Sequence, residues 1–145
     1  MKISTKGRYA LRMLIDLAMH SEEGYIALKD IAERQNISKK YLEQIVPILN
    51  RSDLLRTNRG NQGGYALAKE PGKYTVGEIL RLTEGNFAPV PCVGKNPEKC
   101  VRCSECPTLP IWQGFYKVVT EYFDGITLQD ILDRQREREI NDYMI

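Results

Sequence analysis

The sequence predicts a mainly α-helical fold with a small β-hairpin, organised as a winged helix-turn-helix followed by a long dimerisation helix. Apolar residues recur at helical spacing along most of the chain, and two short helical segments flank a tight turn at 36–37. A glycine-rich stretch at 59–64 separates two short runs of alternating apolar and polar residues. With 145 residues, the chain is one domain or a small domain with an appendage.

The chain begins with a basic segment that leads into the first predicted helix. Ser4 and Thr5 are N-cap candidates, and the apolar residues of 10–19 recur at helical spacing. Backbone N–H groups and the positive end of the dipole at a helix start favour phosphate. The candidate DNA-binding residues here are Lys2, Thr5, Lys6 and Arg8. The alternative is a helix start that only faces solvent.

Two short helices follow, and their arrangement is typical of a DNA-binding helix-turn-helix. An extended entry at 25–28 leads into the first, over 29–35, and Ser38 caps the second, over 39–46. Pro47 should kink or end the second helix. Its free face supplies the candidate DNA-binding residues Ser38, Lys39, Lys40, Tyr41, Glu43 and Gln44.

The segments 54–58 and 65–68 predict a β-hairpin with a flexible, basic tip. A hairpin directly after a helix-turn-helix is a wing. We expect Arg59, with Gly60 beside it, to reach an adjacent minor groove, where A/T tracts concentrate negative potential. The alternative for the glycines is an ordinary turn.

The second half of the chain is predicted to hold three further helices. Thr75 and Glu78 form a capping box for a helix that runs to Glu84. The segment 109–123 is rich in large apolar residues that a small domain cannot easily bury, which favours a two-fold dimer through this helix over packing inside one chain. A last helix follows 125–130 and ends in a solvated, charged tail. The predicted division is a DNA-binding domain at 1–74, a linking helix and cysteine loop at 75–107, and the dimerisation and C-terminal helices at 108–145.

All four cysteines lie close together, at Cys92, Cys100, Cys103 and Cys106, and Pro107 follows them. Soft thiolates at this spacing favour an iron-sulfur cluster or a structural zinc ion. The alternatives are disulfides, inert thiols, or a redox pair of Cys103 and Cys106 in an enzyme. We find no secretory signal and no run of 18 apolar residues, so we expect a cytoplasmic protein without a membrane partner. Cytosolic thiols stay mostly reduced, which disfavours disulfides, and no βαβ pattern surrounds the pair.

Charge is distributed unevenly along the chain. Residues 1–70 hold twelve Lys or Arg against eight Asp or Glu, whereas residues 71–145 hold nine against eleven. The basic half is the better candidate for binding a polyanion. This bias is mild, since a solvated charged surface explains it nearly as well.

The segments 1–10, 37–44, 59–65 and 126–128 closely resemble the IscR, NsrR and CymR type of bacterial winged-helix regulator. The resemblance covers nearly the whole chain. It implies a homodimeric transcription factor rather than an enzyme, and in IscR-like members a 2Fe-2S cluster held by three loop cysteines. Position by position, these ligands fall at Cys92, Cys100 and Cys106. The implied function is control of iron-sulfur cluster assembly genes in response to cluster status.

The sequence departs from the family at the fourth ligand. IscR-like members place a His where this chain has Leu109, and NsrR-like members place an acidic residue where it has Arg8. Candidates are Cys103, Glu98, Glu105, a partner residue or an exogenous ligand. An all-thiolate site would also suit a 4Fe-4S cluster and a repressor that senses nitric oxide or redox state. CymR-like members lack the loop cysteines, so that branch fits poorly.

The implied partner is double-stranded DNA with a palindromic operator. Lys and Arg side chains would neutralise phosphates, while Gln44 suits adenine and Glu43 accepts from cytosine N4. We expect Glu43 to penalise sites that lack this cytosine. The rival interpretations are a zinc-stapled DNA-binding dimer and a dithiol enzyme.

Overall fold

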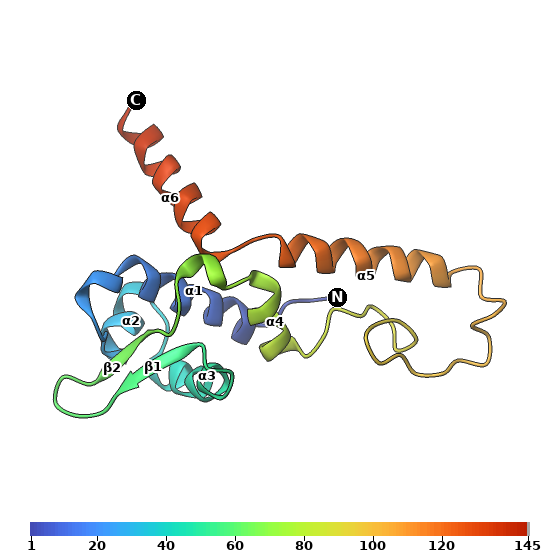
Figure 1. Ribbon diagram of the computed structural model, residues 1–145, viewed down its shortest axis with the longest axis horizontal. Helices are drawn as coiled ribbons and strands as arrows, with labels where there is room; N and C mark the ends of the chain where they lie inside the picture. The colour runs from blue at the N-terminus through green and yellow to red at the C-terminus, as the bar shows by residue number, and fades with distance from the viewer. Residues whose placement is uncertain (145) are drawn as a thin grey trace.

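The structure is a computed structural model that describes residues 1–144 (Figure 1). Helices α1 to α4 and the hairpin gather into one body, whereas α5 and α6 project away from it. The elements are α1 (Thr5–Met19), η1 (Ser21–Glu23), α2 (Leu28–Gln35), α3 (Lys39–Arg51), β1 (Leu55–Asn58), β2 (Gly64–Leu67), η2 (Pro71–Lys73), α4 (Val76–Glu84), α5 (Leu109–Asp124) and α6 (Leu128–Tyr143). The prediction of a mainly α fold with one hairpin is therefore confirmed.

Helix α1 lies at the centre of the body. Its apolar residues at 10, 13, 14 and 17 recur every three or four positions, which puts them on the same side of the helix. That side packs against buried side chains of α3, α4 and α6. The fully buried members of this core are Ala10, Met13, Leu14, Leu17, Ile31, Leu42, Ile45, Leu49, Leu54, Tyr74, Ile79 and Leu128.

The helix-turn-helix forms as predicted. Asn36 ends α2 with a φ of 52°, the left-handed conformation that Asn tolerates better than most residues. Ser38 then caps α3, because its side-chain oxygen accepts the N–H of Tyr41 at 3.0 Å.

Helix α3 continues through Pro47 to Arg51. Of the two outcomes predicted for Pro47, a kink or a helix end, the helix end is therefore wrong and the kink stays a prediction. Proline has no N–H to offer, so the carbonyl of Glu43 lacks its usual helical donor. Leu49 is fully buried beyond the proline and anchors the last turns to the core. That burial outweighs the loss of one helical hydrogen bond.

The hairpin is confirmed, with Leu55 opposite Leu67 and Asn58 opposite Gly64. It is also tied to the chain before α2, because Ile26 and Tyr65 exchange two main-chain hydrogen bonds of 2.8 Å. This approach requires glycine at position 64, where a β-carbon would collide with the Ile26 carbonyl. The wing is therefore fixed at its base.

Tyr74 joins the base of the wing to α6. Its side chain is fully buried, and its hydroxyl donates to the Leu54 carbonyl at 2.5 Å and accepts from the Ala68 N–H at 3.0 Å. Its own carbonyl accepts the N–H of Leu128 at 3.1 Å. Burial is the main cause that raises the pKa of the Tyr74 hydroxyl above its ordinary value.

Only half of the predicted capping box forms at α4. Thr75 accepts the N–H of Glu78 at 3.0 Å, but the Glu78 carboxylate lies 3.3 Å from Lys69, with which it forms an ion pair. A reciprocal capping box occurs instead at the start of α6, between Thr127 and Asp130, with bonds of 3.1 and 2.9 Å.

Helix α5 contains no buried residue, although it carries many large apolar side chains. Tyr116, Val119 and Phe123 are partly covered by a second, smaller core formed by Val76, Leu80 and Phe87. Two hydrogen bonds of 2.8 and 2.7 Å between Arg81 and Asp124 fix the end of α5 against α4. Five further large apolar residues of α5 are exposed: Ile111, Trp112, Phe115, Val118 and Tyr122.

Within residues 1–144, none of the helices combines the length and apolar character needed to cross a membrane. The predicted division into three segments stays a prediction. Side chains of α4 and α6 nevertheless share the core of the helix-turn-helix, through Ile79 and Leu128.

Candidate nucleic-acid interface and cysteine loop

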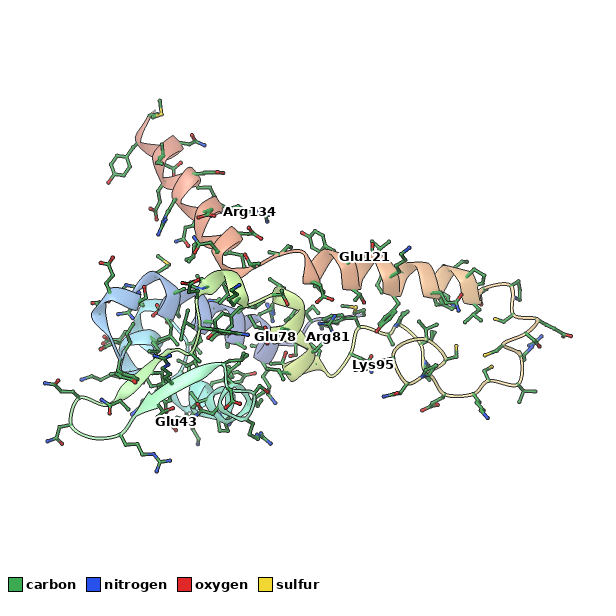
Figure 2. The ribbon with its side chains drawn as sticks, viewed as in Figure 1. Glu43, Glu78, Arg81, Lys95, Glu121 and Arg134 are labelled. Carbon is green, nitrogen blue, oxygen red and sulfur yellow. The ribbon has the colours of Figure 1, made fainter. Side chains whose placement is uncertain are left out.

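A hollow of about 520 Å³ lies between the start of α2, the outer face of α3 and the hairpin. Four of the predicted DNA-binding residues line it: Lys39, Glu43, Arg59 and Gly60. All four are exposed to solvent. Figure 2 shows Glu43 on the hairpin side of the molecule, away from the projecting α5. The structure thus brings cationic groups from two elements to one concave surface around a single carboxylate.

The hollow also contains polar residues that sequence reasoning missed: Lys29, Asn50, Thr57 and Asn58. The Thr57 hydroxyl lies 3.3 Å from Asn50 Oδ1, so α3 contacts β1 directly across the hollow. Asn50 stands seven positions after Glu43, which places both on one face of an uninterrupted helix. The signal was present, but the expected helix end near Pro47 hid it.

The other candidates on α3 have different surroundings. The Ser38 hydroxyl serves as the N-cap, and the Tyr41 ring packs edge-on against Tyr9 with centroids 5.4 Å apart. The Ser38 side chain therefore stabilises the start of α3, and the Tyr41 ring packs this helix against α1. Lys40 and Gln44 are exposed, but they do not line the hollow.

The basic N-terminal candidates lie on α1 and its lead-in, and they do not line the hollow either. Lys2 and Arg8 are exposed, whereas Thr5 and Lys6 are half-buried. The Arg8 guanidinium donates to the Thr5 hydroxyl at 2.9 Å. This group of cations therefore forms a second basic area, outside the lining of the hollow.

A buried carboxylate, which sequence reasoning missed, braces the helix-turn-helix from inside. Asp16 is 1% exposed and accepts two hydrogen bonds from Arg34, of 3.0 and 2.7 Å, and one of 3.0 Å from Gln35. The hydrogen bond to Asp16 is the main cause that raises the pKa of Arg34. The only sequence signal was a lone acid among the apolar residues of 10–19. The network fixes the end of α2, and with it the turn into α3.

The cysteines lie in the loop at 85–108, which contains turns but no helix or strand. All four thiols are free, with Cys100 exposed and the others half-buried. Cys103 donates its N–H to the Cys100 carbonyl at 3.1 Å, which closes a turn between them. A 3.4 Å contact with the Thr108 hydroxyl is the main cause that lowers the pKa of the Cys106 thiol.

The chemistry of this donor set fits an iron-sulfur cluster or a zinc ion, because thiolates are the preferred ligands of both. The spatial arrangement is less complete: among residues 1–144, no three His, Cys, Asp or Glu side chains lie together as a metal site. Leu109, where a His ligand is expected in IscR-like proteins, is the first residue of α5. The ligand set therefore stays a prediction.

Comparison with known proteins gives consistent matches over most of the chain. Residues 3–134 match the family model Rrf2, described as an iron-dependent transcriptional regulator. The chain is 39% identical over 132 residues to the protein rrf2 of Nitratidesulfovibrio vulgaris, covering 91% of this chain and 87% of that protein. A structure of CymR from B. subtilis, named the global cysteine regulator, superposes with a TM-score of 0.75 at 40% identity, covering 92% and 98% of the two chains. A structure of T. potens IscR gives a TM-score of 0.75 at 37% identity, covering 95% and 90%.

Proposed function

The chain belongs to the Rrf2 family of transcriptional regulators, and on this premise we propose that it binds a palindromic DNA operator as a homodimer and responds to iron-sulfur cluster status through its cysteine loop. As a member of this family it is a regulator and not an enzyme. Its place would be the bacterial cytoplasm, where the operator is.

The observation that carries the DNA-binding half of the proposal is the hollow beside α3. Lys39 from the recognition helix and Arg59 from the wing line it together with Lys29. Cations that flank an exposed helix can neutralise phosphates on both sides of a major groove and fix the register of the helix. Glu43, in the same hollow, is repelled by phosphate and accepts a hydrogen bond only from a donor such as cytosine N4.

The cysteine loop carries the sensing half. Cys92, Cys100 and Cys106 would hold the cluster, with Cys103 as a candidate fourth ligand. A bound cluster would supply redox and ligand-exchange chemistry that oxygen, nitric oxide or iron shortage can alter. The chain's own contribution is a solvent-accessible loop that connects α4 of the body to the exposed α5 (Figure 1).

Dimerisation is supported by the exposed apolar face of α5. Ile111, Val118 and Tyr122 are each at least 60% exposed, and they lie at helical spacing on one side. Large apolar patches of this kind mark interaction surfaces. A second copy related by a two-fold axis would cover the same residues on both chains and would match the symmetry of a palindrome.

The DNA-binding half is tested by selecting duplexes from a randomised library with the wild-type protein. Binding of the enriched duplex is then measured by fluorescence anisotropy for wild type and Glu43→Ala. We expect the variant to lose about 1–3 kcal/mol of discrimination between sites with and without the contacted cytosine. Unchanged discrimination would remove Glu43 from the specificity role, and failure to enrich any duplex would refute DNA binding.

The sensing half is tested by anaerobic purification, followed by an absorbance spectrum and iron, sulfide and zinc analysis of wild type and Cys103→Ala. A brown protein with near-equal iron and sulfide supports a cluster, and loss of colour in the variant makes Cys103 a ligand. A colourless protein that contains only zinc would replace cluster sensing with a zinc-stapled dimer. Turnover with a thiol reductant, without DNA affinity, would instead support a dithiol enzyme.

A further inference from the structure

Glu84, the last residue of α4, is bonded to the start of α1, eighty residues away in the sequence. One oxygen of its carboxylate accepts both the main-chain N–H of Ser4 at 2.8 Å and the Ser4 hydroxyl at 2.7 Å. Ser4 is also the N-cap of α1, since its hydroxyl oxygen accepts the N–H of Gly7 at 3.1 Å. The first turn of α1 has no acidic residue of its own. Glu84 therefore supplies the negative charge that a helix start favours.

The contact is sterically matched as well as hydrogen-bonded. Gly7 is buried against α4, and a β-carbon at this position would collide with the Glu84 carboxylate and the Thr83 hydroxyl. Any larger residue at position 7 would push the carboxylate away from Ser4. Glycine here is explained by this close approach of two helices, because its backbone conformation is ordinary helix.

The segment that is hydrogen-bonded to Glu84 through Ser4 is the basic N-terminus. Lys2 lies two residues before Ser4, and Lys6 and Arg8 lie in the first turn of α1 that Ser4 caps. Ile3 packs against the small core of Val76, Leu80 and Phe87. The conformation of the first residues therefore depends on α4.

We propose that Glu84 is a positioning residue that holds the basic N-terminal segment for contact with DNA phosphates and links that segment to the cysteine loop. The inference rests on the proposed function and deepens it. The link follows from chain order: Gly85 begins the loop with a φ of 87°, and Phe87, 1% exposed, lies in the same small core as Ile3. A displacement of the loop at its first residues thus acts on both contacts that hold the N-terminus.

The positioning role predicts an effect opposite in sign to simple electrostatics. Glu84 is an acid among cations, so its removal alone should strengthen DNA binding. If it positions the cations instead, Glu84→Ala weakens binding, while Glu84→Gln keeps an acceptor oxygen for Ser4 and binds at least as well as wild type. The matched control is Glu78→Ala, a half-buried glutamate on the same helix that pairs with Lys69 and not with α1.

The experiment measures the affinity of the protein without iron for the duplex that wild type enriches from a random library, over a range of salt concentrations. For Glu84→Ala we expect about tenfold weaker binding at low salt. The slope of the logarithm of affinity against the logarithm of salt concentration should fall by the equivalent of about one to two phosphate contacts. Glu84→Gln and Glu78→Ala should retain the wild-type salt slope. Tighter binding by both Glu84 variants would overturn the proposal.

Gly7→Ala provides a second, independent way to break the contact. It keeps the Glu84 charge, displaces the carboxylate and favours the helical state of α1. We expect it to reproduce the reduced salt slope of Glu84→Ala with circular dichroism close to wild type. A Gly7→Ala protein that is folded and keeps the wild-type slope would overturn the proposal. Failure of wild type to enrich any duplex is a different result, since it refutes the proposed function itself.

The link to the loop has its own measurement. Wild type and Glu84→Ala are compared before and after anaerobic reconstitution with iron and sulfide, with cluster content read from the absorbance spectrum. We expect reconstitution to change the DNA affinity of wild type. At equal cluster content, the change in the logarithm of the affinity for Glu84→Ala should be less than about half of the wild-type change. An equal change in both proteins would overturn the link while leaving the positioning role in place.

Discussion

Helix α1, at the centre of the body, and the projecting helix α5 differ in how far their residues are buried. Helix α1 buries seven of its fifteen residues, whereas the sixteen residues of α5 include none that is buried. Both helices are rich in large apolar side chains. The difference shows that a high apolar content predicts a helix face that is favourable to bury. It does not predict whether that face is buried by the same chain. The body covers its apolar side chains within the chain, whereas α5 leaves most of its own exposed.

The largest expected effect on the free energy of unfolding comes from replacing isoleucine with alanine in the body, compared with the same substitution in α5. Ile79 of α4 is fully buried and Ile111 of α5 is 60% exposed. Ile79→Ala should lower the free energy of unfolding by about 2–5 kcal/mol, because it leaves a cavity in the core. Ile111→Ala should change it by less than about 0.5 kcal/mol in dilute, monomeric protein. Urea denaturation followed by circular dichroism measures both, and equal losses would erase the distinction between the regions.

The apolar character of the exposed face of α5 can be disrupted directly with Phe115→Asp. A charge at the centre of the proposed dimer interface should weaken association about 100-fold or more, equivalent to about 2.8 kcal/mol. Sedimentation equilibrium measures the shift from dimer to monomer. Gln113→Asp, on the opposite side of the same helix, is the control and should leave association intact. A wild-type protein that is monomeric at all concentrations would contradict the prediction.

Tyr74→Phe tests the connection between the wing and α6. Removing the hydroxyl leaves the Leu54 carbonyl and the Ala68 N–H without their partner, which should lower the free energy of unfolding by about 1–3 kcal/mol.

The raised pKa of Tyr74 adds a pH dependence. The folded state holds the phenolic proton more tightly than the unfolded state, so this contribution is complete below the unfolded pKa of about 10 and declines as pH rises through the folded value. The free energy of unfolding measured between neutral and alkaline pH should therefore fall less steeply in Tyr74→Phe. Parallel curves for the two proteins would contradict this account.

The smallest effect is expected where the two regions meet. Asp124→Asn breaks the ion pair with Arg81 and leaves the Arg81 guanidinium over the Phe87 ring, 5.0 Å from its centre. Because the two charged side chains are 38% and 40% exposed, the loss should be below about 1 kcal/mol and should shrink at high salt. Thermal unfolding at two salt concentrations measures it. A larger loss would mean that this pair, rather than apolar packing, fixes the direction of α5.

Local signals account for the parts of the fold that sequence reasoning found. Caps such as Ser38 and Thr75, helical spacing and the glycine-rich tip act over a few residues, so they can be read in order along the chain. The continuation of α3 past Pro47 was missed because burial of Leu49, a tertiary effect, overrides a local breaker.

The candidate site was predicted less completely, and for the same reason. The hydrogen bonds of Asp16 with Arg34, and of Glu84 with Ser4, join residues far apart in the sequence, and no pattern of spacing reveals such pairs. Asn50 was hidden by the expected helix end. The four cysteines were recognised from their close spacing in the sequence, but spacing does not determine how their sulfur atoms are arranged in space.

The proline inside α3 has a consequence for whatever surface this helix meets. The carbonyl of Glu43 has no helical donor, and both Glu43 and Pro47 face solvent. A surface that excludes water from this point must bring its own donor or leave a buried acceptor unsatisfied, at a cost of about 1–3 kcal/mol. The main-chain carbonyl thus favours surfaces that offer a hydrogen-bond donor at this point of α3. This preference is the same whichever side chain stands at position 43.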